Sequence, residues 1–207
     1  MAFRAIAFFA GKIRDPYLLS ALLAVLPLTE IKGSILYAAS GEENLLLSAF
    51  FAYLASVLLS LFLSLIVPRL FLFAERHPRL RKVRALLCDR LASAADKISK
   101  RSRKGSDASE TFFFGVYAFV ALPLPLTGVY AGAILASILG LSFGRSFFAL
   151  SAGNFTAGGI VLALALVAGE HASVVLDLFC TLILVVLLIS FLKRLIKKRR
   201  MRHSTEK

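Results

Sequence analysis

The sequence predicts an all-α polytopic membrane protein, and three long uncharged runs are the main reason. None of Asp, Glu, Lys, Arg or His occurs in residues 44–68, 111–144 or 146–169, which are 25, 34 and 24 residues long. A helix needs about 20 apolar residues to cross a bilayer, so each run is long enough. The runs are continuous rather than alternating, which argues against a β-barrel.

Composition and charge point to the same class. Hydrophobic residues make up 58% of the chain, against about 45–50% in soluble domains, which excludes a soluble enzyme, a disulfide scaffold and a disordered chain. The net charge is +13, but 19 of the 25 basic residues lie in two segments, 75–110 and 193–207, that flank apolar runs. This distribution follows the positive-inside rule, so we expect both segments in the cytoplasm beside anionic lipid and expect no nucleic-acid partner.

The run 111–144 predicts a re-entrant hairpin. As one straight helix its 34 residues would be about 51 Å long, whereas the hydrocarbon core is about 30 Å thick. Pro123 and Pro125 break the helix near its middle. Two crossings by 146–169 and 172–192, plus a hairpin, keep both basic segments in the cytoplasm. One long kinked helix is the alternative.

An internal repeat extends this prediction to the first half of the chain. Pro27-Leu28-Thr29 matches Pro125-Leu126-Thr127 at an offset of 98, and residues 50–55 match 147–152 at an offset of 97. Each unit therefore consists of a hairpin and a full span, and the two units have opposite orientations, as in many transporters. For residues 16–40 a single crossing stays open, because a hairpin leaves the basic N-terminal residues outside.

Four segments follow from these patterns. Residues 1–74 hold an interfacial helix (2–13), the first hairpin (16–40) and a transmembrane helix. Residues 75–110 form a basic amphipathic segment on the inner leaflet. Residues 111–169 hold the second hairpin (111–144) and a transmembrane helix, and residues 170–207 hold an extra C-terminal transmembrane helix and the basic tail. The apolar stripe of the amphipathic segment consists of Val83, Leu87, Leu91, Ala95 and Ile98.

Glu30 and Lys32 are the strongest candidates for a site, because they are the only charges between Pro16 and Ser40. A charge near mid-membrane costs about 2.5–3.5 kcal/mol on insertion scales and usually faces a cavity or a partner. Glu30 fits proton exchange or a stabilising role in the first turn of its own helix. Residues i and i+2 do not share a helix face, so Lys32 either contacts a substrate anion or extends to the surface.

Other polar residues near the helix breaks complete the predicted site. Thr29 and Thr127 occupy equivalent positions, where their hydroxyls cap the following half-helices or bind a ligand. Half-helix N-termini offer free amides to an anion. Asn154 is expected to make a buried interhelical hydrogen bond or to line the pathway, while Arg69 and Arg145 anchor the interface or contact anions. The predicted hairpin elbows contain Pro27, Gly33, Pro123, Pro125 and Gly128.

Two stretches carry a resemblance to a known family, namely residues 26–34 (LPLTEIKGS) and 122–132 (LPLPLTGVYAG). There the chain resembles the small multidrug export protein family, which is distantly similar to the DedA superfamily. The family's Glu-x-Lys/Arg-Gly pattern falls on Glu30, Lys32 and Gly33. Its Pro-x-Pro-Gly-Thr-Gly pattern falls on 123–128, with Leu126 at the first Gly. The resemblance implies opposed re-entrant hairpins and transport, with lipid phosphate as a competing substrate class.

We therefore expect a secondary transporter, multi-pass in the cell membrane with a cytoplasmic C-terminus. It would move a small amphipathic or anionic, lipid-phosphate-like substrate, with proton coupling. A non-transporting scaffold that binds anionic lipid or proteins is the alternative. The sequence contains no nucleotide loop, catalytic triad or metal-ligand cluster, so we expect no enzyme, cofactor or metal. A homodimer and the side of the N-terminus stay open.

Overall fold

The computed structural model describes residues 15–41, 44–102, 108–124 and 127–171, with the isolated positions 13, 174, 178, 181 and 185. The described residues contain helices and no strand, which confirms the all-α prediction for this part of the chain. The predicted N-terminal helix, last span and basic tail lie outside it, apart from those isolated positions. The helices are α2 (Pro16–Val25), α3 (Glu30–Ala39), α4 (Leu45–Arg76), α5 (Pro78–Ser102), α6 (Ala108–Ala121), α7 (Val129–Ile138) and α8 (Phe143–Ala168), followed by a 3₁₀ turn, Gly169–His171.

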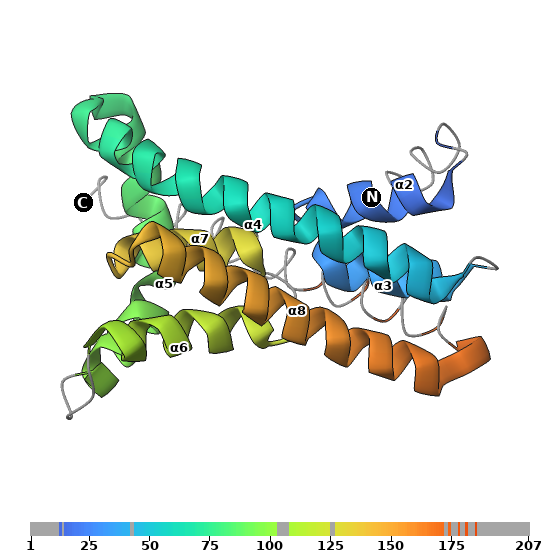
Figure 1. Ribbon diagram of the computed structural model, residues 1–207. Coiled ribbons are helices and arrows are strands. Elements are labelled where there is room, and N and C mark those ends of the chain that lie inside the picture. The colour runs from blue at the N-terminus through green and yellow to red at the C-terminus, as the bar shows by residue number, and fades with distance from the viewer. Residues whose placement is uncertain are drawn as a thin grey trace, which may run out of the picture.

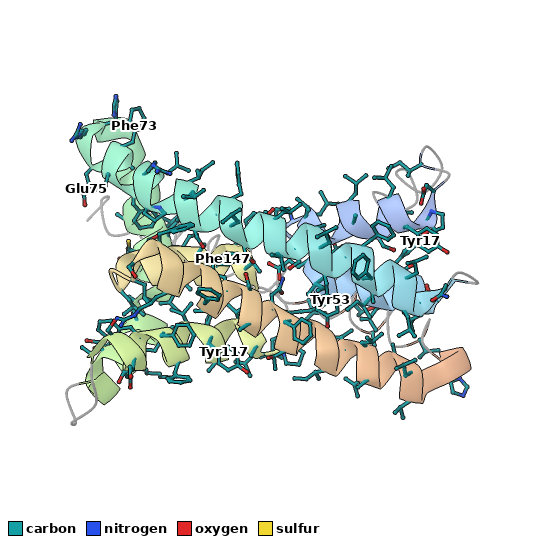
Figure 2. All side chains as sticks on the ribbon, viewed as in Figure 1. Tyr17, Tyr53, Phe73, Glu75, Tyr117 and Phe147 are labelled. Carbon is teal, nitrogen blue, oxygen red and sulfur yellow. The ribbon has the colours of Figure 1, made fainter. Side chains whose placement is uncertain are left out.

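The helices α4 and α8 form the centre of the molecule and run antiparallel (Figure 1). Both are long and apolar enough to cross a membrane. α4 and α8 contact each other at Tyr53, whose hydroxyl donates to the Phe155 carbonyl at 3.2 Å. Figure 2 shows Tyr53 between the two helices. A Cβ at position 158 would lie only 2.7 Å from that hydroxyl, so Gly158 permits the close helix packing that its small size predicts.

A first pair of short helices, α2 and α3, folds back on itself. Asp15 caps α2 by accepting hydrogen bonds from two backbone amides with its carboxylate. The chain turns through residues 26–29, which we call the first elbow. The Ser34 hydroxyl then donates to the Ser20 carbonyl at 2.6 Å, with both residues buried. The two helices therefore lie side by side, and the chain does not continue through residues 16–40 as one straight helix.

A second pair, α6 and α7, is separated by residues 122–128, which we call the second elbow; positions 125 and 126 within it are not described. A Cβ at Gly132 of α7 would collide with Val120 of α6, so the two helices approach closely there. The arms of both pairs have 10 to 14 residues, or about 15–21 Å. Each arm is thus shorter than the hydrocarbon core of about 30 Å.

The amphipathic helix α5 corrects one expectation. We predicted that its apolar stripe lies on lipid, but Leu91, Ala95 and Ile98 belong to a cluster with residues of α4, α6 and α7. Ile98 packs against Gly115 of α6, where even a Cβ would clash. The second half of this stripe therefore covers protein, because the ends of α4 and α6 present a continuous apolar surface to it.

The two helix pairs lie at opposite ends of the α4–α8 pair (Figure 1). The first pair packs beside the start of α4 and the end of α8, and the second beside the end of α4 and the start of α8. The two elbow regions contact each other, and a separate hydrogen bond between Ser56 and Asn154 joins α4 to α8. Each of these residues is eleven positions from the start of its helix, or about 17 Å along the axis. This is about half of a length that spans a bilayer.

Candidate functional site at the elbow junction

The two elbows are joined by reciprocal hydrogen bonds, and we call this region the elbow junction. From the first pair, the Lys32 ammonium donates to the Leu124 carbonyl of the second elbow at 3.0 Å. From the second pair, the Tyr130 hydroxyl donates to the Val25 carbonyl at 2.5 Å. Each donor lies near the start of the second helix of its pair, and its acceptor is the last residue of α2 in one case and an elbow residue three positions after the end of α6 in the other. Carbonyls freed by the helix breaks thereby gain partners.

The carboxylate of Glu30 lies at the N-terminus of α7. Val129 and Tyr130 are the first two residues of α7, and backbone amides in the first turn of a helix have no intrahelical acceptor. Gly128 leaves the space for the carboxylate, since a Cβ at that position would overlap it. The helix dipole stabilises a negative charge at such a terminus. The predicted helix-terminus role of Glu30 therefore exists, but α7 of the other pair receives the carboxylate rather than α3.

Glu30 and Lys32 form a buried ion pair, which corrects the expectation that they point to different faces. The Lys32 Nζ atom is 3.8 Å from a Glu30 carboxylate oxygen. Glu30 has a φ of +49°, a left-handed conformation that departs from the regular helical direction. The two side chains can converge for that reason. Lys32 is 1% exposed, so it does not extend to the surface.

The two threonines also differ from the prediction. We expected them to cap the half-helices that follow, but neither α3 nor α7 has a side-chain cap. Instead, the Thr29 hydroxyl donates to the Leu23 carbonyl at 2.5 Å, and the Thr127 hydroxyl donates to the Leu122 and Leu124 carbonyls, both at 2.9 Å. Both hydroxyls thus donate to carbonyls on the N-terminal side of their elbow; Leu23 also accepts from the Leu26 amide.

Asn154 makes the expected interhelical hydrogen bond. It is 2% exposed, and its side-chain amide donates to the Ser56 hydroxyl of α4. Its carbonyl oxygen has no partner among the described residues. The repeat contains the signal that would have found Ser56 and Tyr130, because at the offset of 98 they align with Asn154 and Lys32.

Some predicted residues lie elsewhere. Arg69 is exposed and donates to the Leu65 carbonyl at 2.9 Å, and Arg145 is exposed at the start of α8. They are 13 and 9 residues from Ser56 and Asn154 on the same helices, or about 20 and 14 Å along the axes. In this conformation, neither arginine contributes to the elbow junction. Of the predicted elbow residues, Pro27 is exposed, Pro123 half-buried and Gly128 buried, while Pro125 lies outside the described residues. Gly33 corrects the prediction, because it is buried within α3 and not in the elbow.

The centre of the junction is buried, and an open groove lies elsewhere. Lys32, Ile31 and Val129 are at most 1% exposed. The groove runs between α5 and α6, has a volume of about 930 Å³ and includes Lys97, Phe114 and Tyr117 in its lining. Figure 2 shows Tyr117 between α6 and α8, where its hydroxyl lies 3.0 Å from that of Thr156.

Within the described part of the chain, no three His, Cys, Asp or Glu side chains gather as metal ligands would.

The hydrogen bond between Asn154 and Ser56 gives a first testable prediction. In a double-mutant cycle of Asn154→Ala and Ser56→Ala, we expect a coupling free energy of about 0.6 kcal/mol, the average for interhelical hydrogen bonds in membranes, and at most about 1.7 kcal/mol. Unfolding in mixed detergent micelles provides the measurement. The pair Ser137→Ala and Asn154→Ala serves as control, since Ser137 bonds within its own helix. Equal coupling energies for the two pairs would contradict the prediction.

The junction residues from Glu30 to Asn154 lie inside a range that matches a protein-family model. The model is described as "Putative small multi-drug export protein" and matches residues 30–160. The chain belongs to the small multi-drug export protein family. The resemblance seen in the two elbow motifs is therefore confirmed. No curated protein and no solved structure gave a significant match.

Membership in the small multi-drug export protein family indicates where the protein is located and what kind of activity its family is named for. Together with the apolar helices α4 and α8, it places the protein in a membrane. The family's description names export as the activity. The matched range begins at the ion pair and ends within α8, so it includes both half-helices that start at an elbow, α3 and α7.

Proposed function

We propose that this protein is a proton-coupled secondary transporter of the cell membrane, and that its substrate passes the elbow junction. The observation that carries the proposal is the buried pair of Glu30 and Lys32 between the two elbows. Charges at membrane depth are expensive and mark substrate or proton pathways by default. Membership in an export family agrees with a transport role.

An inverted repeat of re-entrant hairpins supports this mechanism. Residues that lie on a two-fold axis contact their own equivalents. Two pairs at the offset of 98 do so: Asn154 bonds Ser56, and the Glu30 carboxylate fills the space beside Gly128. The reciprocal bonds from Lys32 and Tyr130, also 98 apart, fit the same axis to within one residue, since their acceptors Leu124 and Val25 are 99 apart. Both helix pairs are then hairpins that enter from opposite faces of the membrane and meet near its middle.

The substrate class follows from the charges at the junction. Because Lys32 neutralises Glu30 at 3.8 Å, the pair offers no free carboxylate to a cationic molecule. When Glu30 takes up a proton, the ammonium of Lys32 and the amides at the start of α7 lose their anionic partner. They are then free to bind a carboxylate or phosphate group of a small amphipathic substrate. Exchange of exposure between the two faces would follow by rocking of one hairpin unit against the other.

Flux measurements on proteoliposomes test the proposal. The vesicles carry an internal pH dye, a transmembrane pH gradient and one of three probes: an alkyl phosphate, an aryl sulfonate or a quaternary ammonium dye. We expect protein-dependent uptake of the anions, accompanied by proton movement, and none of the cation. Uptake that does not exceed that of protein-free vesicles for all three probes would overturn the proposal. So would uptake of the cation alone.

The topology is tested separately. Single cysteines at positions 105 and 203, in a background without Cys88 and Cys180, are labelled in whole cells with a membrane-impermeant thiol reagent. Both should be protected until the membrane is opened, because two crossings and one hairpin separate them. Labelling of one position and not the other in intact cells would contradict a re-entrant second hairpin.

A further inference from the structure

The two elbows are equivalent in sequence but not in chemistry. Position 30 of the first half corresponds to position 128 of the second at the repeat offset of 98, and the residues are Glu and Gly. The Glu30 carboxylate lies where a side chain of residue 128 would be. The N-terminus of α7 therefore receives an anion from the opposite hairpin. Gly128, having no side chain, can give nothing of the kind to the N-terminus of α3.

We propose that Glu30 is a one-sided plug that holds the two hairpins in the conformation described here, with Gly128 as its socket. This inference rests on the proposed function, in which the two halves exchange conformations. In the exchanged state, residue 128 would face the start of α3 and leave those amides without an anion. The docked carboxylate thus stabilises one of two otherwise similar states, and its release is linked to the change between them.

The residues around Glu30 make the described conformation more stable than the exchanged one. Lys32 and Tyr130 are the charged and titratable groups that face it from α3 and α7. Docking also holds Glu30 at a φ of +49°, a strained conformation for a residue with a side chain. A plug that is strained and docked against two amides and one ammonium can be released by neutralising its charge. Protonation of Glu30 would therefore unlock the junction and set the direction of the coupling.

The two halves contain a matched pair of reporter positions. Ala38 of α3 and Ala136 of α7 are 98 residues apart, have the same side chain, and are 3% and 1% exposed. Each is changed to Cys, separately, in a background without Cys88 and Cys180. Labelling rates with an impermeant thiol reagent, applied to both faces of proteoliposomes, give a ratio that reports which half is open. Because the reporters are equivalent, exchanging the two states should invert this ratio.

The deciding variant moves the plug to the other hairpin by combining Glu30→Gly with Gly128→Glu. We expect the labelling ratio to invert, with a change on the order of tenfold, since coupling energies between protein states typically correspond to 5–150-fold effects. Glu30→Gln alone keeps the volume and should move the ratio toward one. Glu110→Gln, an exposed position at the start of α6, should leave it unchanged.

Each outcome decides the inference. An unchanged ratio in a swap variant that elutes as a single species overturns the plug. If the swap variant does not fold, Glu30→Gln decides, and a ratio equal to that of the unmodified protein overturns the plug. The same vesicles are assayed for anion uptake. Uptake with an unaltered ratio contradicts the plug and leaves the transporter intact, whereas absent uptake by the unmodified protein contradicts the transporter itself.

Discussion

Changing Lys32 to Met is expected to lower the free energy of unfolding by about 3–5 kcal/mol, because it leaves the buried Glu30 carboxylate without its cation. The ammonium is 3.8 Å from that carboxylate and 3.0 Å from the Leu124 carbonyl, which loses one of its two donors and keeps the Thr127 hydroxyl. Methionine preserves the length and apolar stem of the side chain, so packing changes little. Unfolding in mixed detergent micelles, followed by circular dichroism, measures the loss.

Two further variants separate the charge effect from general sensitivity. Lys97→Met removes an exposed lysine of α5, and such surface changes usually stay within about 0.5 kcal/mol. The double variant Lys32→Met with Glu30→Gln removes both charges and should recover much of the loss, since no uncompensated ion remains. A Lys32→Met protein as stable as Lys97→Met would show that the pair is not a buried, charged one.

Changing Glu30 to Gln is expected to abolish proton-coupled transport while leaving the protein folded. Glutamine has nearly the same size as glutamate, so it should fit the buried site beside Gly128 without disturbing the fold, although it lacks the charge that holds the side chain at the start of α7. It cannot take up or release a proton. Uptake of an alkyl phosphate into proteoliposomes should therefore no longer respond to a pH gradient.

The matched control for this experiment is Glu110→Gln. Glu110 is exposed in the first turn of α6 and lies far from the junction along that helix. This variant should transport and couple as the unmodified protein does. If Glu30→Gln retained gradient-driven uptake, the proton would have to bind elsewhere, and Glu30 would keep only a structural role at the N-terminus of α7.

Much of the fold follows from local sequence features. The runs without charge predict the membrane helices α4 and α8, and the prolines at 27 and 123 predict where helices must end. Asp15 and Pro16 predict the start of α2. These predictions hold because hydropathy, helix breaking and N-capping depend on residues within about one helical turn. The candidate residues Glu30 and Lys32 follow equally directly, since a charge in an apolar run is visible without a structure.

The contacts of those residues do not follow from local rules. Sequence reasoning placed the Glu30 carboxylate on its own helix, and placed Thr29 and Thr127 at the starts of helices rather than at the ends of the preceding ones. The left-handed backbone at Glu30 also has no signal in the sequence, because glutamate rarely adopts it. Packing decides such features, since the carboxylate gains partners in α7 that no neighbour in sequence provides.

By itself, then, the sequence determined that this is a helical membrane protein of an export family, with breaks at two proline elbows and a charged pair beside one of them. Only the tertiary structure decided that the elbows meet, that Lys32 and Tyr130 bond across them, and that Glu30 fills the space beside Gly128. The physical reason is the distance along the chain over which each kind of interaction acts. Helix breaking and hydropathy act between neighbours along the chain, whereas these contacts join residues about 90 to 105 positions apart and exist only once α4 and α8 hold the two pairs end to end.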